Sequence, residues 1–261
     1  MNFENFLLDL YDNTEKAQTI ADIDTVFNNL RSDLGFDYGL LTVIFPITFS
    51  RSQNVSLGNY PAEWVKEYME TGYASLDPVV AHCFSKHTPI VWDKNTGKGE
   101  KVVEEFFQKA HNAGLRYGMS VGHKGYDGTV CLISLAGLKP IKTESRDYRK
   151  IVIALYSVIA SLHCKIVETT GATLSEANQP DLTAREKQCL VWAADGKTSG
   201  EIADILGISE STVVFHIKNF IQKLGVTNRS QAVAKAVRLG LILTDYTNFP
   251  KYYFKDAGGL E

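Results

Sequence analysis

Hydrophobic residues recur at helical spacing in several stretches before residue 169. Apolar positions three and four residues apart predict helices over 3–12, 16–34, 61–71, 100–113 and about 144–168. A further short helix is expected to open at Asp77–Pro78, because aspartate is a good N-cap and proline suits a first helical turn.

Other stretches are rich in β-branched and aromatic residues, which is typical of strands. They cover residues 38–46, 88–92, 118–125 and 128–137, with the polar segment 50–58 as an antiparallel partner of the first. We expect Pro46 to end that first strand. The order of elements lacks the strict strand–helix alternation of a parallel sheet. It predicts an N-terminal α-β-α sandwich around an antiparallel sheet.

Residues 182–241 predict four short helices with clear boundaries. Thr183 is followed three residues later by Glu186, and Thr198 by Glu201, which are the residue pairs of two capping boxes. Glycines stand where the helices are expected to end, at positions 196, 207, 225 and 240. This small all-α domain completes an α+β fold class for the whole chain.

Two of these helices form a helix-turn-helix. One lies between Thr198 and Leu206, the turn runs through ILGIS, and the second helix covers about 210–224. In the second helix an inward stripe is expected at Val213, Ile217, Ile221 and Leu224. The outward or lateral positions are Ser211, Val214, Phe215, Lys218 and Gln222. An exposed Val and Phe suit a surface that meets thymine methyl groups or sugars.

The charge distribution supports a nucleic-acid partner for this domain. Five basic residues and no acidic residue lie between Ser211 and Thr244. The net charge is +2 for residues 181–243 and −4 for residues 1–180. Local basicity on an acidic chain is typical of a surface that binds phosphates. The alternative is an ordinary helical bundle with a solvated basic face, and the coincidence of caps, turn and charge disfavours it.

Composition sets broad limits on the class of protein. The chain has 261 residues, 44% of them hydrophobic and 22% charged, as in a soluble globular protein of one large or two modest domains. No apolar run approaches the roughly 20 residues that span a bilayer, and the acidic N-terminus is unlike a signal peptide. We therefore expect a cytoplasmic protein with no membrane partner.

The four cysteines, Cys83, Cys131, Cys164 and Cys189, are scattered and form no CxxC motif. No histidines are paired at ligand spacing, so we expect buried free thiols, no metal site and no cofactor.

The segment ETTGATLSEANQP ending at residue 180 is polar, contains Gly and Pro and has no periodicity, which is typical of a linker. The domain boundaries we expect are 1–168 for a ligand-binding domain, 169–180 for the linker, 181–243 for a DNA-binding domain and 244–261 for a C-terminal tail.

A set of aromatic residues and one carboxylate gathers between residues 60 and 92. The set is Tyr60, Trp64, Tyr68, Tyr73, Asp77 and Trp92. Taken singly, each aromatic residue has an interpretation as core and the aspartate as a helix cap. Together, phenol and indole donors beside a carboxylate acceptor suit a concave apolar site for a small amphiphilic molecule.

An enzyme is the first alternative, because Gly118-Met-Ser-Val-Gly122 matches the GxSxG pattern of hydrolases. That serine needs a strand-to-helix turn, whereas here the match lies inside a predicted hairpin strand. A phosphorylation-controlled regulator would need alternating βα units in the first domain, which the pattern lacks.

The motifs resemble a known family. LTAREKQCL, GKTSGEIADILGIS, STVVFHIKN and QKLGVTNRSQAV resemble the LuxR/GerE DNA-binding domain. NYPAEW, Tyr68, DPVV, PIVW and the strand at Gly118 are similar to the autoinducer-binding domain of LuxR-type quorum-sensing regulators. The resemblance spans nearly the whole chain up to about Thr244. It implies a transcriptional regulator that binds an N-acyl-homoserine lactone as its small-molecule autoinducer and double-stranded operator DNA as a homodimer.

The resemblance also implies roles for residues of the first domain. Trp64 would donate a hydrogen bond to the lactone carbonyl, Tyr60 would donate to the amide carbonyl, and Asp77 would accept from the amide N–H. Ser134 is a second donor candidate.

Further residues would enclose the ligand. Trp92 and Tyr68 would form walls for the lactone, with Phe106 and Leu115 nearby. Val79 departs from the family pattern, because many members carry a hydroxyl two places after the aspartate.

For DNA, we expect groove contacts from Val214, Phe215 and Lys218. Phosphate contacts are expected from Lys197, Thr198, Ser211, Thr212, Lys223 and Arg229. His216 and Asn219 are either structural or DNA-contacting. The alternative function is a regulator of the same family that responds to a non-lactone small molecule or to none. Acyl-chain length and oxidation state, and activation versus repression, stay open at this point.

Overall fold

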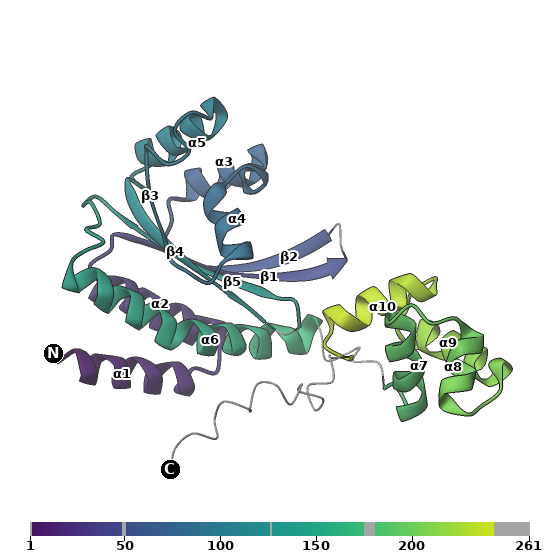
Figure 1. Cartoon of the computed structure of the whole chain (residues 1–261). Helices are drawn as coiled ribbons and strands as arrows, with labels where there is room; N and C mark the ends of the chain where they lie inside the picture. Colours follow the sequence, from purple (N-terminus) through teal and green to yellow (C-terminus); the bar gives the residue numbers. More distant parts are fainter. Residues whose placement is uncertain (1, 49–50, 126, 175–180, 243–261) are drawn as a thin grey trace, which may run out of the picture. The chain divides into compact units, whose positions relative to one another are not determined.

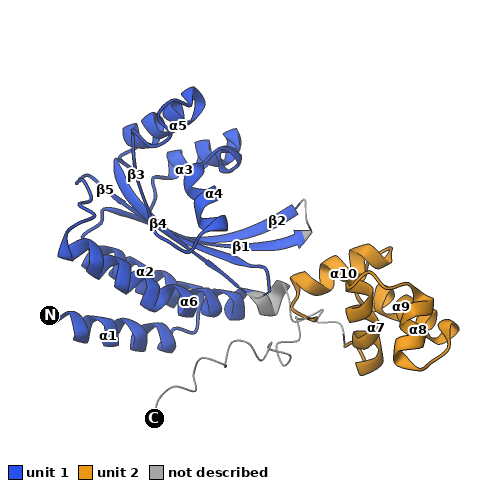
Figure 2. Ribbon diagram, viewed as in Figure 1, with its two compact units in different colours: residues 1–178 blue, residues 179–261 orange. Residues whose placement is uncertain are grey.

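The computed structural model describes residues 2–48, 51–125, 127–174 and 181–242. The chain divides into two compact units between Asn178 and Gln179, shown in two colours in Figure 2. The expected tail over 244–261 lies outside the described residues, and so does the second half of the expected linker. Each unit is described by itself.

The first unit is built on one antiparallel sheet with the strand order β2-β1-β5-β4-β3. Its strands are β1 (Tyr38–Thr48), β2 (Arg51–Gly58), β3 (Ile90–Asp93), β4 (Tyr117–Lys124) and β5 (Val130–Gly137). Helices cover both faces of this sheet (Figure 1). The predicted α-β-α sandwich is therefore confirmed.

The two faces of the sheet carry different sets of helices. On one face lie α1 (Phe3–Lys16), α2 (Ile20–Asp33) and α6 (Arg146–Leu174). On the other lie α3 (Ala62–Thr71), a 3₁₀ turn (Tyr73–Ser75), α4 (Pro78–Ser85) and α5 (Lys101–Asn112). Side chains alternate along each strand, so Ile133 and Leu135 of β5 join the core under the first set, whereas Leu132 faces the second.

Helix α6 is long and apolar enough to cross a membrane by length and composition. Its buried residues instead recur three and four apart and pack into the core beside the sheet: Leu155, Val158, Ile159, Leu162 and Ile166. We therefore interpret α6 as a core helix. It also runs to Leu174, six residues past its predicted end, so the first half of the expected linker is helical.

Other boundaries differ from the prediction, since the helix expected over 3–12 runs to Lys16. Two further differences have a clear cause. The helix expected over 16–34 begins only at Ile20, because Thr19 and Asp22 form a capping box that starts a new helix after α1. Strand β1 continues through Pro46 to Thr48. Proline is tolerated there because pairing with β5 ends at Ile44, and Pro46 faces Ser52 of β2 on the other side.

The four cysteines are free, and three are buried as expected. Cys164 is exposed, contrary to the prediction. Neighbouring side chains on a helix point about 100° apart, and the adjacent His163 takes the inward position at 2% exposure. There its ring nitrogens lie 2.9 Å from Nδ1 of His123 and 2.7 Å from the hydroxyl of Thr129.

The second unit contains the four predicted helices. They are α7 (Ala184–Ala194), α8 (Ser199–Leu206), α9 (Glu210–Lys223) and α10 (Arg229–Arg238). Both predicted capping boxes are formed, at Thr183 and at Thr198. Gly207 ends α8 with a φ of 64°, a left-handed conformation that favours glycine. The helix-turn-helix geometry thus follows from local signals in the sequence.

The inward stripe of α9 differs in part from the prediction. Val213 and Leu224 are buried, but Ile217 and Ile221 are only partly buried. Phe220, which the spacing argument left out, is fully buried. A ring at this position reaches the centre of the small unit, so the stripe is wider than a row of every fourth residue.

Lys223, expected at DNA phosphates, has partners inside this unit. Its Nζ lies 2.8 Å from Oε2 of Glu186 and donates to the carbonyl of Asp181. The Glu186 side chain is 3% exposed. Burial alone would raise the pKa of Glu186, but the hydrogen bonds from Lys223 and Thr183 outweigh it and hold the pKa below its usual value. The pair joins the start of α7 to the end of α9.

We expect Lys223→Met to lower the stability of the full-length protein by about 1.5 kcal/mol, because it leaves the Glu186 carboxylate without its charged donor. A lowered carboxyl pKa stabilises the folded state above the usual pKa of glutamate, and this contribution is lost as the pH falls. The deficit measured by denaturant unfolding should therefore shrink on acidification. Lys187→Met, at an exposed position of α7, is the control; equal effects of the two variants would contradict the assignment.

Candidate functional site

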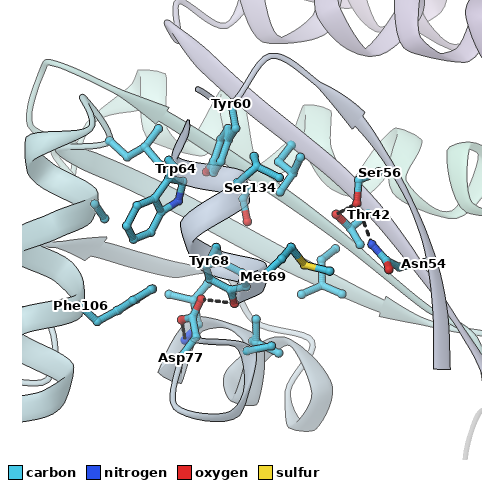
Figure 3. Close-up of a pocket in the computed structure, with 18 of the residues that line it drawn as sticks. Thr42, Asn54, Ser56, Tyr60, Trp64, Tyr68, Met69, Asp77, Phe106 and Ser134 are labelled. Carbon is cyan, nitrogen blue, oxygen red and sulfur yellow. Dashed lines mark hydrogen bonds between the residues drawn. The ribbon is translucent and has the colours of Figure 1, made fainter. Parts of the chain in front are cut away.

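The first unit encloses a cavity of about 450 Å³ between the sheet and the helices α3, α4 and α5 (Figure 3). Every ligand-binding residue proposed from the sequence lines it: Tyr60, Trp64, Tyr68, Asp77, Val79, Trp92, Phe106, Leu115 and Ser134. They come from α3, α4, α5, two strands and the segments between them. The fold thus brings the whole set to one place.

Asp77 stands at the start of α4 and is 9% exposed. One carboxylate oxygen accepts from the backbone N–H of Val79 at 2.8 Å, and the other accepts from the hydroxyl of Tyr68 at 3.0 Å (Figure 3). Burial raises the pKa of Asp77, and these hydrogen bonds partly offset the rise. The carboxylate is therefore both a helix cap and an acceptor at the cavity wall.

Two hydrogen-bond donors of the cavity lack protein partners. The buried hydroxyl of Tyr60 has none within the part of the chain that the structure describes. Its pKa is raised by burial and by the Asp77 carboxylate, and the nearby hydroxyl of Ser134 partly opposes this rise without meeting hydrogen-bond geometry. The indole N–H of Trp64 likewise donates to no described residue. An unpaired buried donor such as the Tyr60 hydroxyl is uncommon, so it is a point where a bound molecule can be held.

A chain of hydrogen bonds orients Ser134. The indole N–H of Trp92 donates to the hydroxyl of Ser120 at 3.0 Å, and the hydroxyls of Ser120 and Ser134 lie 2.8 Å apart. The indole N–H can only donate, so the Ser120 oxygen is the acceptor of that bond. The hydroxyl proton of Ser120 is then free to be donated to the oxygen of Ser134. Ser134 then has its proton available for an acceptor inside the cavity.

Aromatic rings close the cavity between α3 and α5. The Trp64 ring lies 5.6 Å from that of Phe106 and 6.1 Å from that of Tyr68, and Tyr73 stacks behind Trp64 at 5.9 Å. These centroid distances are typical of attractive aromatic pairs.

An ion pair joins the same two helices at the surface. Nζ of Lys109 lies 2.7 Å from Oε1 of Glu67, and both contact the hydroxyl of Tyr73. Exposed ion pairs contribute little energy, so the rings hold this wall together and the pair adds orientation.

The GxSxG match has a structural explanation. A Cβ on Gly118 would lie 2.1 Å from the Trp92 ring, and one on Gly122 would lie 2.3 Å from the backbone of Cys83 in α4. The glycines therefore let an indole and a helix pack closely on β4. Ser120 between them is fully buried, and β4 is followed by β5. The strand-to-helix turn that a serine nucleophile needs is absent from this stretch.

Part of the lining was not predicted from the sequence. Met69 and Val65 of α3 face the cavity, as do Thr42 of β1 and the side chains of Ser52, Asn54 and Ser56 on β2. For the three β2 residues, the only signal in the sequence was strand alternation, because residues 52, 54 and 56 share one face of a strand. A polar strand face gives no sign of whether it meets solvent or a cavity.

The lining defines what the cavity can bind. Tyr60, Trp64 and Ser134 offer donors, whereas Asp77 offers an acceptor. The lining residues include no Lys, Arg or His. The remaining side chains are mainly apolar. A neutral molecule with one N–H or O–H, two or more carbonyl-like acceptors and an apolar body matches this arrangement.

In the second unit, the residues expected in a DNA groove share the exposed side of α9. Val214 is 37% and Phe215 59% exposed, and Lys218 is exposed one helical turn beyond Val214. Adjacent large apolar side chains on the surface of a small helical unit are typical of interaction sites.

The expected phosphate contacts have mixed surroundings. Ser211 and Thr212 lie in the first turn of α9, where both hydroxyls approach that of the N-cap Ser209. Thr198 uses its hydroxyl in the cap of α8, and the guanidinium of Arg229 donates to the carbonyl of Lys197. Thr198, Ser211 and Thr212 lie at the starts of α8 and α9, and Arg229 begins α10 with its guanidinium beside the start of α8; helix N-termini favour anions.

His216 and Asn219 are both partly buried. Nδ1 of His216 has no hydrogen-bond partner within the described residues, and its ring contacts that of Phe215. These surroundings are compatible with a structural role and with a DNA-contacting role for both residues.

Comparison with known proteins agrees with the division of the chain. Residues 19–161 match the autoinducer binding domain, and residues 180–236 match the bacterial regulatory proteins of the luxR family. Together these ranges cover most of both units.

The chain resembles characterised regulators over most of its length. It is 34% identical to the transcriptional activator protein AnoR of Acinetobacter nosocomialis, over 83% of this chain and 90% of that protein. It is also 34% identical to the transcriptional activator protein VanR of Vibrio anguillarum, over 90% of this chain and 97% of that protein. A crystal structure of Escherichia coli SdiA covers 93% of this chain and 100% of its own, with 25% identity and a TM-score of 0.73. The chain therefore belongs to the LuxR family of quorum-sensing transcriptional regulators, with an autoinducer-binding domain followed by a helix-turn-helix DNA-binding domain.

Proposed function

We propose that this regulator binds an N-acyl-homoserine lactone in the cavity of its first unit and operator DNA through its second unit as a homodimer. The observation that carries the lactone assignment is the convergence of unpaired donors and one buried acceptor in a single apolar cavity. An acyl lactone offers one amide N–H, two carbonyl groups and an apolar chain. Each of these has a counterpart in the lining.

The lactone fits the lining in one orientation. Asp77 accepts from the amide N–H, Tyr60 and Ser134 donate to the amide carbonyl, and Trp64 donates to the lactone carbonyl. Tyr68 and Trp92 flank the ring, with Phe106 and Leu115 nearby. Val79 contributes apolar contact alone, so the amide receives no hydroxyl from that position.

Ligand binding stabilises the folded first unit. A ligand that binds only the folded state adds RT ln(1 + [L]/Kd), which is roughly 2.7 kcal/mol at one hundred times Kd. Filling the cavity also gives the unpaired donors their partners. The lactone thereby controls how much competent dimer is present in the cytoplasm, the compartment that holds the DNA.

On DNA, α9 lies in the major groove with Val214, Phe215 and Lys218 at base edges. Lys197, Thr198, Ser211, Thr212 and Arg229 supply phosphate contacts, whereas Lys223 acts through its ion pair with Glu186. A dimer reads two half-sites spaced by about one helical turn, or a multiple of it. The names of the relatives AnoR and VanR favour activation of transcription.

The second candidate is a regulator that responds to another acyl compound or to none. One solved SdiA complex holds octanoyl-rac-glycerol, an acyl ester without an amide. Asp77 favours the amide, because a lactone carries an amide N–H beside its amide carbonyl, whereas an acyl ester has no N–H at that point for the carboxylate to accept.

Mass spectrometry of the small molecule retained by the full-length protein distinguishes these candidates. The protein is produced with a panel of acyl-homoserine lactones and matched acylglycerols. Retention of a lactone in a one-to-one ratio supports the proposal, whereas retention of acylglycerols alone, or of neither class, contradicts it.

We expect Asp77→Asn to weaken lactone binding by about 1.5–3 kcal/mol, because the amide N–H loses a charged acceptor. The unliganded variant should be as stable as the wild type, since asparagine still caps α4 and removes a buried charge. Thermal unfolding with and without lactone measures both effects. Asp22→Asn, in the exposed capping box of α2, is the control. An unchanged lactone response would mean that Asp77 is only a cap.

We expect Lys218→Ala to weaken operator binding by about 1–3 kcal/mol, the range of a groove contact, and to leave lactone affinity unchanged. A titration of operator affinity against salt concentration measures the loss. Lys101→Ala, an exposed position of the first unit, makes the same change in net charge and serves as control. If both variants bind operator equally well, the groove assignment of α9 is wrong.

A further inference from the structure

The edge strand β2 presents a polar face to the cavity. Ser52, Asn54 and Ser56 line it, whereas Val55 and Leu57 on the opposite face pack against the core under α2 and α6. Thr42 of the neighbouring strand β1 extends this polar strip (Figure 3). The strip is therefore a second polar region of the same cavity, at its exposed rim.

Hydrogen bonds link three side chains of the strip. The Thr42 and Ser56 hydroxyls lie 3.0 Å apart, and the Asn54 amide donates to the Ser56 hydroxyl at 3.2 Å. One proton suffices to join the two hydroxyls, so the other hydroxyl proton is left over. The strip can thus donate a hydrogen bond to an oxygen atom that reaches it.

Strand register sets the distance from the strip to the amide end of the cavity. Leu40 of β1 is opposite Ser134 of β5, and Thr42 is opposite Ser56 of β2. Two strand spacings and two residues along the strand separate Ser134 from Ser56 by about 12 Å. An extended hydrocarbon chain, advancing about 1.3 Å per bond, covers this span in roughly nine bonds.

The side chains around this path are apolar, and none is cationic. Leu40, Ile44 and Leu132 line it, with Met69 of α3. An apolar stretch followed by neutral hydroxyl and amide groups suits a neutral oxygen on a hydrocarbon chain. A terminal carboxylate would find no positive partner.

We propose that Thr42, Asn54 and Ser56 form a distal subsite for a neutral oxygen substituent, a hydroxyl or a ketone, near the ninth carbon of the ligand's acyl chain. This inference rests on the proposed lactone function, which fixes the amide at Tyr60 and Ser134. The subsite is remote from the amide. It is distinct from the donors Tyr60, Trp64 and Ser134, which bind the lactone and amide carbonyls.

The test compares three dodecanoyl-homoserine lactones: unsubstituted, 3-hydroxy and 9-hydroxy. Affinities for the purified full-length protein are measured by calorimetry. We expect the 9-hydroxy compound to bind about three- to tenfold more tightly than the unsubstituted one, the gain of one additional hydrogen bond. The double variant Thr42→Val with Ser56→Ala should lose this preference while its ratio for the 3-hydroxy compound is unchanged. Each ratio is taken within one protein, so a change in overall stability cancels.

Gln53→Ala is the matched control, because Gln53 is an exposed residue of β2 on the face away from the strip. It should keep the preference for the 9-hydroxy compound. Binding of all three lactones without that preference, or its survival in the double variant, would overturn the distal subsite alone. Binding of no lactone would overturn the proposed function and the subsite together.

Discussion

A carboxylate removed from water must accept hydrogen bonds from the protein or from a bound molecule, and in the first unit this constraint falls on Asp77. Its oxygens receive the N–H of Val79, which starts α4, and the hydroxyl of Tyr68, which ties α3 to the same point. The raised pKa of Asp77 records the cost that these bonds do not fully offset. In the proposed lactone complex a ligand N–H completes this set, so the residue that organises the cavity wall would also be the acceptor for an amide.

Most of the fold could be predicted because local physics and tertiary packing agree. Caps at Thr183 and Thr198 and alternation in the strands placed the elements of both units correctly. The errors arose where a local signal was ambiguous. The second helix was expected to start at residue 16, whereas the capping box of Thr19 and Asp22 begins α2 at Ile20. In α6, the polar stretch after Glu168 is typical of a linker by composition, but the helix continues through it to Leu174, with the hydroxyl of Thr169 bonded to the carbonyl of Lys165.

The part of the cavity lined by Tyr60, Trp64 and Asp77 was predictable from residue type. The rim formed by β2 was not. Tyrosine, tryptophan and aspartate crowded into a short segment are unusual enough to suggest a site, and the fold gathers them with Ser134 from a distant strand. Serine and asparagine on an edge strand are what solvent exposure favours, so Ser56 and Asn54 carried no signal. Only the packing of α3 over the same face of the sheet, through Val65 and Met69, turns that strand into a cavity wall.

Gly118 has a consequence for the size of the chamber. The Trp92 indole lies where any residue larger than glycine at position 118 would place its Cβ. A methyl group there would displace the ring, and the space beside it is the lumen. Because Gly118 has no side chain, the Trp92 ring can lie against β4. A bulkier residue at this position would push the ring into the cavity and narrow it.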